Sequence, residues 1–212
     1  MIHIYAIAEG LDGLPEVEGI QGAPPERFRC NGFDLVVSEQ GAEVEPTEQA
    51  VLAHARVVEA LLPLAEALLP ARFGVAYEDE AALEEAVQER AAKLSESLAR
   101  VRGHVELGVR IIGEERPESE PPATGRAYLE ARAAETRLGN ELHESLAAHA
   151  DAATRAQPPD GRVVLASAYL VDPDRIPSFL GAVEKLKEQH PRLTFAVTGP
   201  WPPYSFAGVD AQ

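Results

Sequence analysis

The chain of 212 residues has little cysteine, little lysine and no long apolar run. Its single cysteine, Cys30, cannot form a disulfide within the chain, which favours a reducing compartment. No stretch reaches the roughly 18 uninterrupted apolar residues that a membrane-spanning helix needs. Residues 1–8 alternate like a strand and lack the basic start of a signal peptide, so we expect a cytosolic protein.

Basic side chains are scarce as well. The chain carries 35 acidic and 19 basic side chains, a formal net charge of -16, and most of this excess falls within residues 1–113. A phosphate backbone has to be met by a basic surface, so nucleic acid is excluded as a partner. The same argument excludes docking on an anionic lipid membrane. The apolar fraction of 45% is nevertheless ordinary for a folded protein.

Motifs for catalysis or for metal and cofactor binding are also missing. The six histidines show no His-Glu-x-x-His or similar metal spacing, and we expect them to be surface or boundary residues. No serine lies in Gly-x-Ser-x-Gly, and no glycine-rich phosphate loop is present. We therefore predict no metal, no cofactor and no enzymatic activity.

Hydrophobic periodicity predicts an α+β fold for the first half of the chain. Strands are expected at residues 2–8 and 33–38, with a glycine- and proline-rich loop between them. Two helices follow, one starting at Thr47 and broken or kinked by Pro63, the other over residues 79–102. A short strand lies between them, and a closing strand follows at 104–112. This order predicts a ferredoxin-like domain over residues 1–113, with helices over a mostly antiparallel sheet.

The second half is expected to form another small α+β domain. Residues 114–124 are acidic and proline-rich, which is typical of a linker. Residues 125–212 then give a long helix over 126–155, a strand over 162–171, a further helix and a last strand at 193–197. The chain ends in an extended tail that is rich in proline and aromatic residues. The fold class predicted is α+β with two small domains.

Three segments are unlike ordinary helix or strand sequence. They are Leu69–Gly74, Gly125–Arg132 and Thr198–Phe206, and the last contains the only tryptophan. Each has a structural alternative: a strand with a bend, a helix start, and aromatics that pack on their own domain. As docking elements they would supply large amphipathic surfaces on a stiff chain. The candidate partner-binding or interdomain residues are Arg72, Phe73, Gly74, Tyr128, Trp201, Pro202, Pro203, Tyr204 and Phe206.

In this order the segments resemble the gas vesicle protein F/L (GvpF/GvpL) family over most of the chain. Leu69–Gly74 resembles a family Leu-Pro-x-Arg-Phe-Gly motif, and Gly125–Leu129 a Gly-x-x-Tyr-Leu stretch. Residues 168–171 followed by Thr198–Phe206 are similar to its terminal signature, and Ile4–Ile7 to its opening strand. The resemblance implies two α+β domains, the first ferredoxin-like.

The resemblance also implies a function and a partner. It implies a non-enzymatic accessory or minor structural protein of gas vesicle assembly, cytoplasmic and vesicle-associated, on the gas-facing side of the shell. Its partners would be the hydrophobic shell subunit, handled in a chaperone-like way, and other gas vesicle accessory proteins. A contact face should then be an uncharged interruption of an acidic surface. The alternatives left open are a small-ligand-binding regulatory module of ferredoxin-like fold and an enzyme with an unrecognised site.

Overall fold

A computed structural model describes residues 1–113, 125–156 and 162–208. The chain forms two compact units, and their boundaries differ from the expected ones. The first unit contains Met1–His104 and the chain from Trp201 onward, and the second contains Val105–Pro200. The predicted linker at 114–124 lies outside the described residues.

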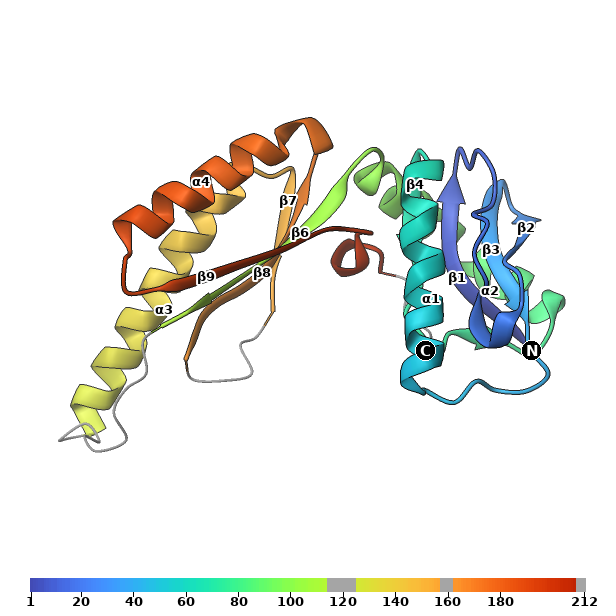
Figure 1. Cartoon of the computed structure of the whole chain (residues 1–212), viewed down its shortest axis with the longest axis horizontal. Coiled ribbons are helices and arrows are strands. Elements are labelled where there is room, and N and C mark those ends of the chain that lie inside the picture. Colours follow the sequence, from blue (N-terminus) through green and yellow to red (C-terminus); the bar gives the residue numbers. More distant parts are fainter. Residues whose placement is uncertain (114–124, 157–161, 209–212) are drawn as a thin grey trace. The chain divides into compact units, whose positions relative to one another are not determined.

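The elements confirm the α+β class. Four helices and two antiparallel sheets are present among the described residues (Figure 1). In chain order they are β1 (Ile2–Glu9), β2 (Glu26–Cys30), β3 (Phe33–Glu39), α1 (Glu48–Leu61), β4 (Ala67–Pro70), β5 (Ala76–Tyr77), α2 (Glu80–Val101), β6 (Val105–Ile112), α3 (Gly125–Ala147), β7 (Ala152–Arg155), β8 (Val163–Val171), α4 (Ile176–Gln189) and β9 (Thr194–Trp201).

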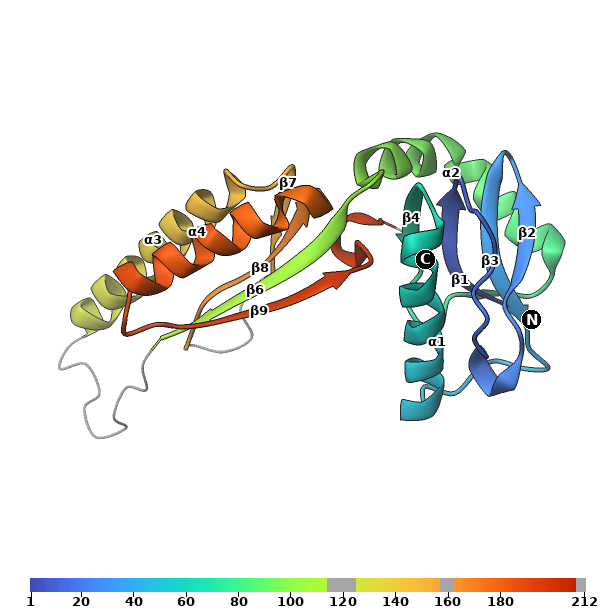
Figure 2. The same cartoon turned by 45° about the horizontal axis from the view of Figure 1, so that its top comes forward.

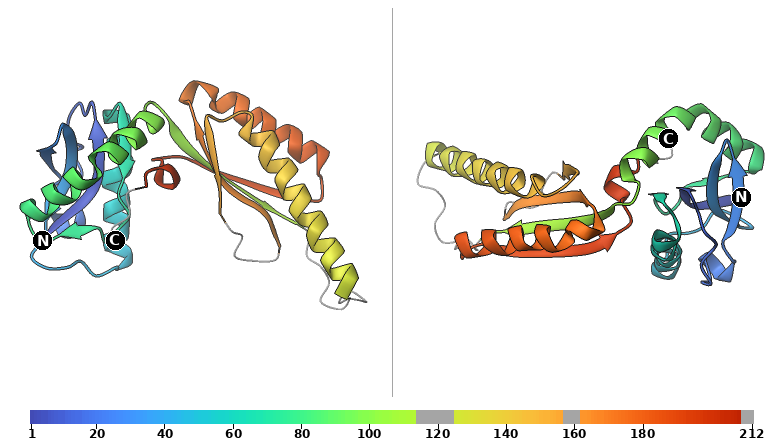
Figure 3. Two further views of the ribbon diagram at one scale, coloured as in Figure 1. Left: turned by 180° about the vertical axis from the view of Figure 1, so that it is seen from behind. Right: turned by 90° about the horizontal axis from the view of Figure 1, so that it is seen from above.

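The first unit has a sheet of order β2-β3-β1-β4, and β5 also pairs with β1. Its two helices lie on opposite faces of this sheet, as the view from above shows (Figure 3). Local signals set both helix starts: the side chains of Thr47 and Asp79 accept hydrogen bonds from the backbone N–H three residues on. As predicted, α1 gives way at Pro63 to a 3₁₀ turn, Leu62–Leu64.

The second unit carries the ferredoxin-like order of elements. Strand, helix, two strands, helix and strand follow each other in the chain, and the sheet order is β7-β8-β6-β9. Both helices, α3 and α4, cover the same face of the sheet (Figure 2). The core between the layers includes Leu107, Tyr169 and Phe179.

Two predicted elements were placed wrongly. The strand at 104–112 was expected to close the first sheet, but as β6 it pairs along its whole length with β8 in the second. Alternation identifies a strand and does not identify its neighbour, so the sequence pattern could not settle this. The helix expected over 126–155 ends at Ala147, and β7 follows it.

No helix among the described ranges is both long and apolar enough to cross a membrane.

Candidate functional site

The Arg72–Gly74 segment forms a tight turn that connects β4 with β5. The N–H of Val75 donates to the carbonyl of Arg72 at 3.3 Å, and Gly74 has a φ of 91°. A positive φ at the third position is characteristic of a type II turn and favours glycine there. The turn lets β4 and β5 pair in succession with β1. The motif therefore has a structural role in the first unit.

Phe73 lies over a pair of buried histidines. Nε2–H of His54 donates to the carbonyl of Ala71 at 2.9 Å, so Nδ1 of His54 carries no proton and accepts from Nε2–H of His3 at 2.9 Å. The Phe73 ring centroid lies 5.8 Å from the ring centroid of each histidine. The turn thus closes over a neutral, hydrogen-bonded histidine pair.

Burial changes the acid–base properties of this pair. His3 is 1% exposed and His54 is 3% exposed. Desolvation, with a smaller repulsion from His54, lowers the pKa of His3 to about 4, and desolvation also lowers the pKa of His54. Nδ1 of His3 is buried and has no hydrogen-bond partner among the described residues. The expectation that all histidines lie at the surface or boundary was therefore wrong for these two.

The C-terminal tail folds back onto the first unit. Pro202, Pro203 and Phe206 are buried, and Tyr204 packs against the core between α1 and the sheet. Burial, and then the nearby Glu59 carboxylate of α1, raises the pKa of Tyr204 to about 12.

Beyond Tyr204, the tail reaches the α2 side of the first unit. Ala207 and Gly208 border a small gap against α2. The 3₁₀ turn Tyr204–Phe206 also contacts edge strand β4, so the tail runs beside this edge from α1 to α2. Covering an edge strand in this way protects its unpaired backbone groups.

The structure brings some of the candidate residues together and leaves others apart. Phe73 and Tyr204 both pack against the same core of the first unit. Trp201 is 42% exposed and is not part of this core. Tyr128 lies in α3 of the second unit, and its side chain is outside those described.

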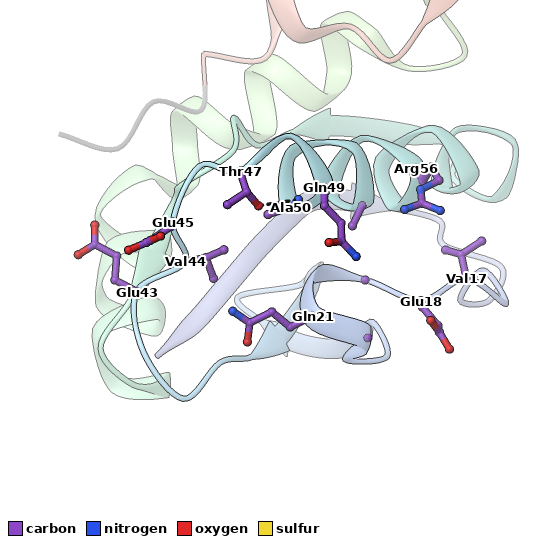
Figure 4. Close-up of a pocket in the computed structure, with 13 residues that line it drawn as sticks. Val17, Glu18, Gln21, Glu43, Val44, Glu45, Thr47, Gln49, Ala50 and Arg56 are labelled. Atoms are coloured by element: carbon purple, nitrogen blue, oxygen red, sulfur yellow. Dashed lines mark hydrogen bonds between the residues drawn. The ribbon is translucent and has the colours of Figure 1, made fainter.

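A groove that the sequence did not indicate runs along α1 in the first unit (Figure 4). It encloses about 750 Å³ between the loop at 17–22, the segment 43–47 and the first turns of α1. The sequence signals there, glycines and prolines, predicted only a loop. The lining residues are Val17, Glu18, Gly19, Gln21, Gly22, Glu43, Val44, Glu45, Thr47, Gln49, Ala50, Ala53 and Arg56.

The loop wall of this groove is fixed from the core. The hydroxyl of Tyr5 on β1 accepts a hydrogen bond from the N–H of Ile20 at 2.9 Å and lies 3.0 Å from Oγ of Ser38. The amide of Gln40 donates to the same Ser38 oxygen at 2.9 Å. The backbone comes so close that a Cβ on Gly19 would collide with the Tyr5 hydroxyl. The core of the first unit therefore holds this wall of the groove in place.

A serine and a histidine also meet in the second unit. Oγ of Ser167 lies 3.2 Å and the hydroxyl of Tyr169 lies 3.1 Å from Nδ1 of His143. Ser167 and Tyr169 are buried below α3, so these contacts satisfy buried hydroxyl groups. Within the described ranges, no three His, Cys, Asp or Glu side chains come together in a way that could hold a metal ion.

Comparison with known proteins gives one consistent result. A model of the family described as gas vesicle synthesis protein GvpL/GvpF matches residues 1–208. Gas vesicle protein L of Streptomyces sp. (strain CB03234) is 30% identical, covering 99% of this chain and 94% of its own length. Gas vesicle protein F2 of Halobacterium salinarum (strain ATCC 700922 / JCM 11081 / NRC-1) is 26% identical, covering 98% and 92%.

Two crystal structures share the fold at low sequence identity. Gas vesicle protein GvpF from Anabaena sp. PCC7120 superposes with a TM-score of 0.81 at 20% identity, over 99% of this chain and 97% of that one. GvpF from Microcystis aeruginosa gives a TM-score of 0.81 at 21% identity, over 98% and 99%.

Proposed function

Because this chain belongs to the gas vesicle synthesis protein GvpL/GvpF family, we propose that it binds the hydrophobic shell subunit of gas vesicles and aids its assembly. In this role the protein is a non-enzymatic accessory factor that works in the cytoplasm, where vesicles form, and contacts other gas vesicle proteins. An apolar subunit aggregates through exposed apolar surface and strand edges. A partner that covers such an edge raises the solubility of the pair.

The observation that carries the proposal is strand β9. It is the last strand of the second sheet, and no strand among the described residues pairs with its outer edge. Residues 193–209, which include β9, contain no Asp, Glu, Lys or Arg in a chain of net charge -16. Thr194, Ala196 and Thr198 are exposed and alternate with Phe195 and Val197, which pack against the core.

An exposed edge without charge is uncommon in soluble proteins. Edge strands are ordinarily guarded by lysine, by proline, by inward-pointing charge or by a covering segment, because an open edge recruits other strands. In β9 the one proline, Pro200, lies near the C-terminal end of the strand. The centre of β9 has none of these guards among the described residues, so it suits the addition of an extended apolar segment. The acidic remainder of the chain would keep the resulting pair soluble.

Co-expression with the shell subunit tests this proposal. We expect the wild-type chain to raise the soluble fraction of the subunit and to co-purify with it. The double variant A196K/T198K puts two charges on the exposed side of β9 and should lose both effects. The double variant S178K/Q189K makes the same charge change on α4 of the same unit and should keep them. The proposal would be contradicted if both variants gave the same soluble fraction and co-purification of the subunit. It would also be contradicted if the wild-type chain did not raise the soluble fraction.

A further inference from the structure

The groove along α1 is lined by apolar, amide and charged side chains. Its apolar lining consists of small and medium side chains, Val17, Val44, Ala50 and Ala53. Two amide side chains, Gln21 from the loop and Gln49 from α1, lie between the two ends of the groove (Figure 4). Amides both donate and accept hydrogen bonds, so they suit the backbone of an extended peptide.

The charges along the groove are unevenly distributed. Glu43 and Glu45 lie at one end, and Glu18 and Arg56 lie at the other (Figure 4). Only Arg56 among the lining residues is basic, so the Glu43–Glu45 end carries acidic charge that no lining base offsets. Complementary potential selects a ligand with positive charge at that end.

We propose that this groove binds an extended segment of a partner protein in which Lys or Arg adjoins small apolar side chains. The basic residue lies at the Glu43–Glu45 end, and the apolar side chains pack over Ala50 and Ala53. The preformed wall supports this occupant, because Tyr5 and Ile20 fix the loop and little ordering remains for binding. The volume of about 750 Å³ is in the range of binding sites and larger than a gap for ordered water.

The groove differs from β9 in position and in chemistry. It lies in the first unit, and its walls are acidic and amide-bearing, whereas β9 belongs to the second sheet and is uncharged. Binding in the groove therefore does not depend on the shell subunit. The groove is a second contact site, and it takes a different kind of segment from the one that pairs with β9.

A positional-scanning array of acetylated and amidated octapeptides, probed with the full chain, tests this proposal. We expect Lys and Arg to be enriched at a fixed position, Asp and Glu to be depleted there, and Ala or Val to be preferred at adjacent positions. Affinity of the best peptide, measured by fluorescence anisotropy, should fall as salt is raised. The array contains no shell subunit, so its outcome is separate from that of the co-expression experiment.

Charge reversal locates the binding site. The double variant E43K/E45K should lower the affinity for the best peptide by about tenfold or more, because it replaces electrostatic attraction by repulsion. The double variant E84K/E85K makes the same charge change on the exposed face of α2 and should bind like the wild type. Glu43 and Glu45 are exposed loop residues, and an unchanged melting temperature checks that the fold is intact. The proposal would be overturned by an array that shows no residue preference at any position, by a preference for acidic peptides, or by equal affinity of the two variants.

Discussion

Acidification should destabilise the first unit through His3. In the folded chain, Nε2–H of His3 donates to His54, and its Nδ1 is buried without a hydrogen-bond partner in the described part of the chain. Adding a proton to Nδ1 puts a positive charge in a desolvated site beside a second histidine. The folded state therefore resists protonation, whereas the unfolded chain takes up the proton at an ordinary pKa.

The size of the effect follows from the two pKa values of His3. The pKa falls from 6.5 in the unfolded chain to about 4 in the folded one, so stability is full above pH 6.5 and declines as the pH drops toward 4. Each pKa unit corresponds to about 1.4 kcal/mol, so His3 alone accounts for about 3 kcal/mol when both states are protonated. Between pH 7 and about pH 4.5 the loss is about 2.5 kcal/mol.

Urea unfolding of the wild type and of H3Q at these two pH values measures this loss. Glutamine keeps an N–H donor that can reach His54 but does not titrate. Trp201, the only tryptophan, belongs to the first unit, and its fluorescence can follow the unfolding of that unit. The wild type should lose about 2.5 kcal/mol more than H3Q, because carboxylate protonation affects both alike. An equal pH dependence of both proteins would show that protonation of His3 does not cause the loss.

Four further outcomes follow from the packing. F206A should lower the free energy of unfolding by about 3 kcal/mol in urea titrations, because Phe206 is buried in the folded tail, whereas W201A should cost less than about 1 kcal/mol. G139A should destabilise the second unit by about 1–3 kcal/mol, since a Cβ there would lie 2.5 Å from the carbonyl oxygen of Val164. G181A, in an open position of α4, should instead raise the melting temperature slightly, because alanine favours the helix. Identical melting temperatures for both glycine variants would contradict the packing argument.

Elements that depend on local signals could be predicted from the sequence. The spacing of Leu83, Val87 and Leu94 gave α2, and all three side chains are buried as that pattern requires. Thr47 caps α1 as predicted, through its side-chain oxygen and the N–H of Ala50 at 3.2 Å. Such signals act within one or two turns of the chain, so a single sequence contains them.

Long-range pairing could not be predicted in the same way. Val105 of β6 pairs with Val171 of β8, far along the chain, and an alternating strand pattern carries no information about that partner. The tail has the same difficulty, since proline and aromatic residues favour an extended path without indicating the surface on which Phe206 is buried. The pairing of β6 with β8 and the position of the C-terminal tail decide where the two units begin and end.

The residues of the candidate site also divide into those that local sequence indicates and those whose role depends on long-range contacts. The Arg72–Gly74 motif was found in the sequence, but its role as a turn over His3 and His54 needs the folded sheet. The groove was not predicted, because its loop wall is held by a hydrogen bond from the N–H of Ile20 to Tyr5 on β1, a contact between distant parts of the chain. A polar tyrosine within the apolar strand β1 was the one signal that could have suggested such a bond.

Amide hydrogen exchange of β9 tests whether the shell subunit pairs with the outer edge of this strand. The amides of residues 194–198 should exchange fast in the free chain where they face the outer edge, because no strand in the described part of the chain pairs there. Binding of the shell subunit should slow exchange in this segment by pairing those groups, and it should leave the amides of β2, the edge strand of the first sheet, unchanged. Unchanged exchange in β9 while the subunit is bound would show that the subunit does not pair with this edge.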